Sequence, residues 1–344
     1  MITCFTGAVL VFEDELEMWT NPSQYWVENQ GQPLPIDTLV SSLQSEYPKA
    51  SITSLKAYTD PERSVELSGK GLPGKAYINP YTGKILSFYN YRDTIFYTNF
   101  ALHRWMLGGD TGKLIVGIAT VIFLFILITG IVLWWPRNKQ ILKNRLKIKT
   151  DGNWKRLNHD LHIVVGFYTA ILLFIFAFTG LAWSFSWVND GIYWVTNTTQ
   201  ERTKAPESNY YELAETIGFD ATLVSAKNEL KDITYPFLSI SMPSDSVGAI
   251  RAQYLPDDAA HVRDYGYIYL DQYTAEPVGK TSFSDYNLGR KVRTLFYPVH
   301  VGSIFGLPGR VIAFIVCLLG TTFPITGTIM WINRLRKKKK SKLV

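Results

Sequence analysis

The chain has 344 residues, of which 47% are hydrophobic, 14% aromatic and only 19% charged, a composition that excludes a disordered or collagen-like chain. Its two cysteines are too few for a disulfide scaffold or a thiolate zinc site, and the sequence contains no Cys-x-x-Cys-His motif for covalent haem attachment. A mean hydropathy of +0.02 fits both a soluble protein rich in apolar residues and a membrane protein with soluble domains. The distribution of apolar residues along the chain therefore has to distinguish a soluble protein from a membrane protein.

Four apolar runs divide the chain. Runs 114–135, 163–188 and 311–332 contain no charged residue and no histidine, and each exceeds the about 20 residues that a bilayer-crossing helix needs. Buried helices of soluble proteins rarely reach this length without a charge, so these runs predict membrane spans. Run 2–12 is too short to span alone and lacks the basic segment and cleavage site of a signal peptide. It predicts the outer half of a first helix whose beginning is missing.

Charge predicts the orientation in the membrane. Segment 137–158 carries eight Lys or Arg residues and the tail from 334 carries seven, which by the positive-inside rule places both in the cytoplasm. Residues 337–340 of this tail are expected either to contact anionic lipid head groups as well or to serve the membrane topology alone. The rest of the chain has 20 basic and 28 acidic residues. The net charge of +6 thus reflects membrane topology, and no nucleic-acid partner is expected.

The predicted organisation alternates membrane helices with larger segments outside the membrane. In chain order it comprises a remnant of a first transmembrane helix at 1–18, a domain at 19–99, an interfacial segment with a second helix at 100–136, a basic loop at 137–158, a third helix at 159–190, a second domain at 191–298, an interfacial segment with a fourth helix at 299–333, and a basic tail at 334–344.

An internal repeat runs through the apolar segments. Each run contains a Thr-Gly pair followed by an aromatic residue, and small residues allow helices to approach closely in lipid. The pairs are Thr6-Gly7, Thr129-Gly130, Thr179-Gly180 and Thr326-Gly327. His103 and His300 each begin a His-x5-Gly-x-x-Gly-basic pattern and stand 26 residues before the next Thr-Gly threonine. The equal spacing predicts that these histidines occupy equivalent positions.

The two outer segments also match each other. The first predicts an amphipathic helix from 35, with Asp37 as its N-cap, and strands at 51–58, 64–68, 75–78 and 84–89. The second predicts a helix from Asp220 to 231 and strands at 236–242, 248–254 and 265–270. Turns at 79–83 and 271–275 share the pattern [Asn/Asp]-x-Tyr-Thr-[Gly/Ala]. We expect a four-helix transmembrane bundle with two α+β outer domains, built as an internal duplication.

Together these motifs resemble the PepSY-associated transmembrane family. The repeated turn is similar to that of PepSY modules, and the Thr-Gly helices, the two histidine patterns and Asp160-Leu161-His162 are similar to the membrane part. The resemblance implies a di-haem protein of the bacterial inner membrane, with two periplasmic PepSY-like domains and a cytoplasmic C-terminus. It also implies reduction of periplasmic ferric siderophores or related ferric chelates. Family members carry a further histidine near the start of the first helix, which here would fall upstream of Met1.

Under this resemblance the histidines become candidate iron ligands. His103 and His300 are expected to hold a b-type haem on the outer side, because facing histidines of two helices are the usual ligands in a bundle. Solvated interfacial rings are the alternative. His162 is the candidate for an inner haem, with the upstream histidine as its partner. His159 lies on the same helical face as His162, so it is either a group beside the ligand or cytoplasmic surface. A metal site of His159, Asp160 and His162 is a third interpretation.

Several other side chains are candidates for contacts with the cofactor. Arg104, Arg290 and Arg293 are expected either to pair with haem propionates or to remain solvated. Trp105 and Trp187 are expected to pack against the porphyrin or to anchor the membrane interface. His261 is expected in a solvated loop.

Two further classes of function remain open. The sequence contains no flavin or nucleotide motif, so electrons would come from quinol or a separate donor protein. One rival interpretation is a non-catalytic module that binds or regulates an exported peptidase or another envelope partner. The other is a non-redox subunit of an iron-uptake system.

Overall fold

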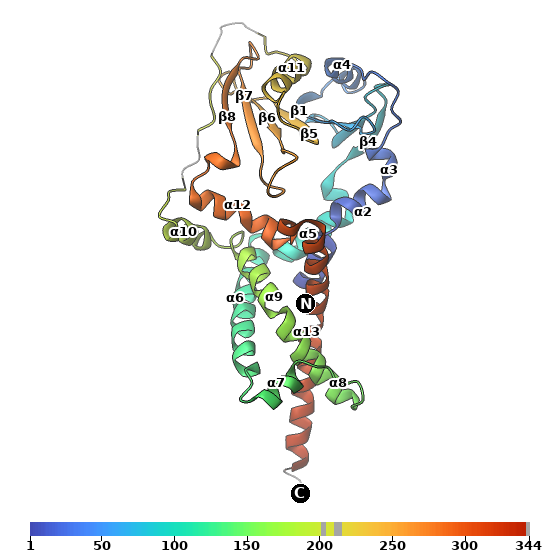
Figure 1. Cartoon of the computed structure of the whole chain (residues 1–344). Helices are drawn as coiled ribbons and strands as arrows, with labels where there is room; N and C mark the ends of the chain where they lie inside the picture. The colour runs from blue at the N-terminus through green and yellow to red at the C-terminus, as the bar shows by residue number, and fades with distance from the viewer. Residues whose placement is uncertain (201–203, 210–214, 342–344) are drawn as a thin grey trace. The chain divides into compact units, whose positions relative to one another are not determined.

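The computed structural model describes residues 1–200, 204–209 and 215–341, with side chains described as far as Arg336. Side chains from Lys337 on, which the sequence places beside lipid head groups, lie outside this described part. The chain forms two compact units (Figure 1). The first contains Met1–Glu13, Ile95–Val195 and Val292–Val344, and the second contains Asp14–Thr94 and Thr196–Lys291. Each unit therefore combines segments from both halves of the sequence.

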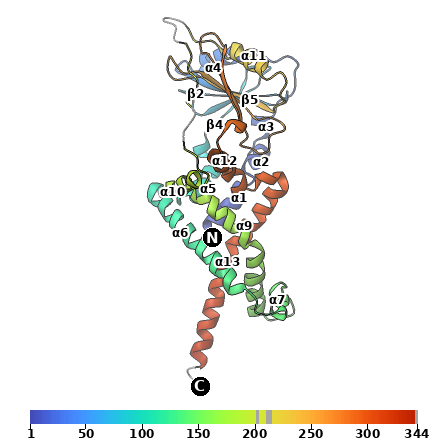
Figure 2. The same cartoon turned by 60° about the vertical axis from the view of Figure 1, so that its left-hand side comes forward.

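The first unit is helical. Three of its helical segments, Gly109–Trp134, Trp154–Leu181 and Ser303–Arg336, are long and apolar enough to cross a membrane, which agrees with the three predicted spans. α9 packs against both α6 and α13, and α1 packs against α5 and α13 (Figure 2). The helices are α1 (Ile2–Leu10), α5 (Ile95–Trp105), α6 (Gly109–Trp134), α7 (Lys139–Arg145), α8 (Trp154–Asp160), α9 (Gly166–Leu181), α10 (Ser186–Val195), α12 (Leu288–His300) and α13 (Gly306–Ser341). A π-helical turn, Leu161–Val165, joins α8 to α9.

The second unit is an antiparallel sheet of eight strands in the order β4-β3-β2-β1-β5-β6-β7-β8. Its strands are β1 (Ser51–Tyr58), β2 (Val65–Lys70), β3 (Lys75–Ile78), β4 (Ile85–Tyr89), β5 (Phe237–Ser241), β6 (Ile250–Tyr254), β7 (Gly266–Leu270) and β8 (Pro277–Thr281). Its helices are α2 (Glu13–Thr20), α3 (Pro22–Tyr25), α4 (Ile36–Glu46) and α11 (Phe219–Glu229). β8 is missing from the predicted strands because its proline and glycine weaken the strand signal.

The two outer segments form one domain, which corrects the prediction of one small domain for each. β1 pairs with β5, so that Leu55 lies opposite Ile240, and both side chains are fully buried. α4 and α11 cover the same face of the sheet (Figure 1), and Leu39 and Leu223 enter one shared core. A four-stranded half would leave β1 or β5 as an exposed apolar edge, and pairing the two halves removes both edges.

The two covering helices cap each other. Asp37 is predicted to cap its own helix, but that position belongs to Pro35, and Asp37 lies in the first turn. Its carboxylate accepts the N–H groups of Phe219 (2.8 Å) and Asp220 (3.2 Å) at the start of α11. The carboxylate of Asp220 in turn accepts the N–H groups of Ile36 (2.8 Å) and Asp37 (2.9 Å). Each aspartate thus satisfies free amides at the positive end of the other helix.

The two predicted turns have the same hydrogen bonds. Asn79 Oδ1 accepts the N–H groups two and three residues further on, at 2.9 and 3.2 Å. Asp271 Oδ1 does the same at 2.8 and 3.1 Å. Gly83 and Ala275 occupy the last turn position with φ of +71° and +60°, a conformation that favours glycine. The shared sequence pattern therefore encodes one turn geometry.

Candidate functional site

Three of the predicted histidines lie against Thr-Gly pairs of the helical unit. In each case the threonine hydroxyl is within hydrogen-bond distance of the imidazole Nδ1, and the glycine lies under the ring. The partners are His103 with Thr6-Gly7, His300 with Thr179-Gly180, and His162 with Thr326-Gly327. The Thr-Gly repeat is therefore a binding position for imidazole rings.

The hydrogen bonds at His103 and His300 define which ring nitrogen carries the proton. His103 Nδ1 lies 2.9 Å from the carbonyl of Thr3, and His300 Nδ1 lies 2.8 Å from that of Phe176. A carbonyl only accepts, so Nδ1 must donate its hydrogen, and in a neutral ring Nε2 then holds a free lone pair. Among the described residues, no hydrogen bond uses Nε2 of either ring. Both imidazoles are thus oriented and protonated in the form that ligates a metal.

His162 is held in a related way. Its Nδ1 lies 2.8 Å from the hydroxyl of Thr326, and that hydroxyl donates to the backbone carbonyl of Thr322 at 3.1 Å. Because the hydroxyl hydrogen is committed to the helix, the oxygen accepts from Nδ1. The ring also packs edge-on against Phe323, with the ring centres 5.7 Å apart. His162 therefore has the same tautomer as the other two histidines.

The glycine of each pair makes room for the ring. A Cβ placed on Gly7 would lie 3.0 Å from Cε1 of His103, and one on Gly180 would lie 3.2 Å from Cε1 of His300. These distances are shorter than an ordinary contact between carbon atoms. In the sequence the small residues indicate close helix packing, and in the structure the space is taken by imidazoles.

His103 and His300 lie close together. Their ring centres are 6.1 Å apart, with the ring planes inclined by 69°. Given metal–imidazole bonds of about 2 Å and ring centres about 1 Å behind the nitrogens, two imidazoles on opposite sides of one metal have centres about 6 Å apart. The observed separation fits a metal ion bound between the two rings.

At the fourth Thr-Gly pair, no imidazole of the described residues lies against the glycine. Thr129 donates its hydroxyl to the carbonyl of Phe125 at 2.9 Å, as the other threonines do within their helices. A Cβ placed on Gly130 would meet no heavy atom within 4 Å. A second imidazole as the partner of His162 stays a prediction.

His159 lies apart from the Thr-Gly pairs. Its Nδ1 is 3.2 Å from Oδ1 of Asp160, and nearly half of its side chain is exposed. The carboxylate of Asp160 is buried and is also bound by Nε of Arg156. Within the described ranges, no three His, Cys, Asp or Glu side chains lie together as a metal site, so Asp160 acts as an ion-pair partner.

The aromatic residue beside the paired histidines is Trp183, which is not among the predicted cofactor contacts. Its ring centre lies 5.4 Å from that of His300. Arg104 donates to its carbonyl at 2.6 Å, and the guanidinium of Arg293 lies 4.9 Å from its ring. Trp183 is the aromatic residue that comes three positions after Gly180, and this position in the repeat was the signal from which its role could have been inferred. The predicted pairing of these arginines with propionates stays a prediction.

The other predicted aromatic contacts lie elsewhere. Trp105 packs edge-on against Tyr97 and Phe100. Trp187 stacks near Phe185, and 59% of it is exposed. Trp187 therefore has the exposure expected of an interfacial anchor, the second of the two predicted roles.

Two predicted residues belong to the sheet unit, since the unit boundary falls within α12, after Lys291. Arg290 lies over the ring of Tyr286, 3.6 Å from its centre. The prediction of a solvated His261 is wrong, because only 6% of it is exposed and it packs edge-on against Phe283 at 4.8 Å. Burial lowers the pKa of His261 below its usual value. The charged residues around His261 in the sequence, Asp257, Asp258 and Arg263, favoured a solvated loop and gave no sign of its contact with Phe283.

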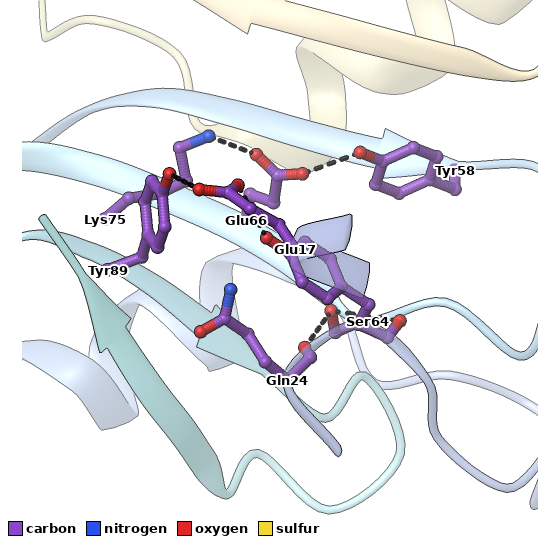
Figure 3. A network of polar contacts seen from close by, with 8 residues as sticks. Glu17, Gln24, Tyr58, Ser64, Glu66, Lys75 and Tyr89 are labelled. Carbon is purple, nitrogen blue, oxygen red and sulfur yellow. Dashed lines mark hydrogen bonds and ion pairs between the residues drawn. The ribbon is translucent and has the colours of Figure 1, made fainter. Parts of the chain in front are cut away.

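A second polar cluster lies on the sheet itself (Figure 3). The buried carboxylate of Glu66 accepts from Lys75 Nζ at 2.7 Å and from the Tyr58 hydroxyl at 2.6 Å, while Glu17 accepts from Tyr89. Burial works to raise the pKa of Glu66, but Lys75 and a second lysine bring it below its usual value. The carboxylate of Glu66 is therefore ionised and paired within the sheet. The hydrogen bond between Tyr89 and Glu17 holds α2 against β4.

The donor set of the helical unit suits haem iron. Neutral imidazoles with Nδ1 bound to the protein are the usual b-type ligands, and the apolar helices supply the surrounding walls. The pair His103 and His300 meets the distance requirement, whereas His162 has no second imidazole among the described residues. The arrangement therefore fits one haem at the paired histidines.

Comparisons with known proteins give a single clear relationship. A crystal structure described as a lipoprotein from Clostridium difficile 630 aligns with 75% of this chain and 99% of its own length, at 9% identity and a TM-score of 0.29. That score is too low to support an argument about fold or function. No curated protein matches the sequence. The family model "PepSY-associated TM region" matches residues 1–334, and the chain therefore belongs to the PepSY-associated transmembrane family.

Proposed function

We propose that this protein is a b-type haem protein of the bacterial inner membrane that passes electrons across the membrane to ferric siderophores or related ferric chelates in the periplasm. The observation that carries the proposal is the separation of 6.1 Å between the rings of His103 and His300, each held through Nδ1. A haem bound between them would supply one-electron transfer.

The residues of the chain have separate roles in this proposal. Carbonyls of Thr3 and Phe176 fix the tautomer, so Nε2 of each imidazole is the ligand atom. Gly7 and Gly180 keep the rings close to the helix backbones. The apolar surroundings exclude water, which favours the neutral imidazole that ligation needs.

An inner haem at His162 is the second part of the proposal. The Thr326 hydroxyl orients His162 as a ligand of this haem. The four Thr-Gly helices would then form a duplicated bundle with two haem positions. The basic loop and tail would be cytoplasmic, the sheet unit periplasmic, and quinol or a separate protein the electron donor.

Spectra of the purified full-length protein test this function. We expect a Soret band and split α and β bands after dithionite reduction, and loss of the outer haem signal in His103→Ala and in His300→Ala. His261→Ala is the matched control, because that histidine lies in the sheet unit and should leave the spectrum unchanged. Reduction of a ferric chelate by the prereduced protein would then test the acceptor.

A colourless, folded protein would contradict the proposal. The non-catalytic interpretations, a module that regulates an exported peptidase or a non-redox subunit of iron uptake, would then stand in its place. Unchanged spectra in both alanine variants would show that other residues ligate the iron.

A further inference from the structure

A pocket opens at the end of the helical unit that carries the basic loop. It has a volume of about 170 Å³ and lies between α7 and the junction of α8 with the π-helical turn. Its lining combines polar residues of α7 and α8 with apolar residues of α7 and the π turn. The residues used below are Ile141, Asn144, Arg145, Arg156, His159 and Ile163.

Positive charge dominates the polar side of this pocket. Arg145 directs Nη1 at the backbone carbonyl of Trp134 at the end of α6, and Arg156 binds Asp160 through Nε. Among the described residues, the terminal amino groups of Arg156 and Nη2 of Arg145 make no hydrogen bond. Each guanidinium is thus held through a single nitrogen, Nη1 of Arg145 by backbone carbonyls at the end of α6 and Nε of Arg156 by Asp160, and retains donors for another group.

The acidic group in the pocket does not cancel this charge. Asp160 is 2% exposed, and its carboxylate is already bound by Arg156 Nε at 2.8 Å, His159 Nδ1 at 3.2 Å and the N–H of Lys149 at 3.2 Å. Two arginines therefore line a pocket whose carboxylate, that of Asp160, is buried and already bound. The donors that remain free are suited to an anion that accepts hydrogen bonds from guanidinium groups.

Phosphate matches that requirement better than a carboxylate or a neutral ring. Its oxygens accept from two guanidiniums at once, and Arg is the preferred partner for such paired hydrogen bonds. Asn144 and His159 at the rim provide further polar contacts. The pocket has room for a group of this size, since one water molecule occupies about 30 Å³ in the liquid.

The apolar side of the pocket indicates a lipid as the source of the phosphate. Ile141 and Ile163 line the same space as the arginines. The pocket adjoins the junction of the polar α8 with the apolar part of the span Trp154–Leu181, the level at which lipid head groups meet acyl chains. A free phosphate ion would gain nothing from isoleucine side chains, whereas a phospholipid presents both surfaces.

We propose that this pocket binds the phosphate head group of an anionic phospholipid, held by Arg145 and Arg156 with its acyl chains along the apolar side. The π-helical turn supports this assignment, because such turns widen a helix and are frequent at functional sites. The site is independent of the proposed haem function and needs no haem for its test. Basic pockets between membrane helices bind acidic lipids by the same physical chemistry.

Native mass spectrometry of the full chain in detergent tests the proposal. Phosphatidylglycerol and phosphatidylcholine are titrated separately, and we expect one retained phosphatidylglycerol with at least tenfold higher affinity, which equals about 1.4 kcal/mol. Arg156→Gln should remove this preference. Lys155→Gln is the matched control, because it removes a neighbouring charge that does not line the pocket.

Asn144→Asp is the second variant, which keeps the protein testable if Arg156→Gln fails to fold. It places a carboxylate at the rim and leaves both arginines intact, so it should weaken phosphatidylglycerol binding at least tenfold. Equal binding of the two lipids, or unchanged binding in both pocket variants, would overturn the proposal. So would preferential binding of inorganic phosphate, or of a short-chain quinone in place of the lipid.

Discussion

The two units of the molecule use repeated polar motifs in different ways. In the sheet unit, Asp37 and Asp220 each cap the helix of the other, so each motif is satisfied by its counterpart. In the helical unit, Thr-Gly pairs hold His103 and His300 through Nδ1, and no described residue bonds to Nε2. A motif that satisfies itself stabilises the fold, whereas one that orients a strong ligand atom without a partner indicates a bound group.

The largest expected effect tests whether the Thr-Gly pairs of the helical unit hold a ligating histidine. In Gly180→Val, the new side chain would displace the ring of His300, because even a Cβ would lie 3.2 Å from its Cε1. For the proposed haem, loss of His300 as an iron ligand should lower retention at least tenfold, as the Soret absorbance per mole of purified protein would show.

Gly130→Val is the matched control for this variant. The same residue changes in the same Thr-Gly context, but a Cβ at this position meets no heavy atom within 4 Å. The outer haem signal should therefore be unchanged. Equal losses in the two variants would mean that valine disturbs the helices generally, and the specific role of the glycines would be refuted.

The next effect concerns the sheet unit. Asp220→Ala removes the acceptor of two N–H groups at the start of α4, which should lower the free energy of unfolding by about 2 kcal/mol. Hydrogen exchange at Ile36 and Asp37 should accelerate, while the haem spectrum should remain that of the unaltered protein. Asp232→Ala, on the loop after α11, is the control. A spectral change in Asp220→Ala would contradict the separation of roles.

Local features of the fold were predictable from the sequence. The limits of β1 and β3 agree with the predicted 51–58 and 75–78, because alternating burial and turn residues act over short distances. The equal 26-residue spacing correctly identified His103 and His300 as equivalent positions. The strand limits depend on neighbouring residues, and the histidine positions follow from an internal repeat that the sequence itself displays.

Long-range features were not predictable. The pairing of β1 with β5 joins residues some 180 positions apart, and the sequence of neither strand indicates which strand it pairs with. The exchange of caps between Asp37 and Asp220 has the same origin, since each aspartate also fits as the cap of its own helix. The role of Trp183 beside His300 depends on how α9 and α12 pack, which a repeat pattern alone does not encode.

A smaller effect distinguishes the two turns of the sheet unit by pH. Burial works to raise the pKa of Asp271, but N–H donors, chiefly that of Tyr273, bring it below its usual value. The unfolded chain then binds a proton first, so stability is present above about pH 4 and is lost as the pH falls through the folded-state pKa. Asp271→Asn, which copies Asn79 of the first turn, should flatten this acid-induced loss in thermal unfolding scans. An unchanged slope would contradict the assignment.

The smallest expected effect lies at the last position of the same turns. Ala275 has φ of +60°, where its Cβ is crowded by the backbone, while the equivalent Gly83 has φ of +71° without that strain. Ala275→Gly should raise the free energy of unfolding by about 0.5 kcal/mol, since relief of strain slightly exceeds the added entropy of the unfolded chain. Gly83→Ala should lower it by about 1 kcal/mol. Thermal unfolding of the two variants measures the direction of both changes in the free energy of unfolding. A destabilised Ala275→Gly variant would mean that the alanine methyl group packs favourably and that the two turns are not energetically equivalent.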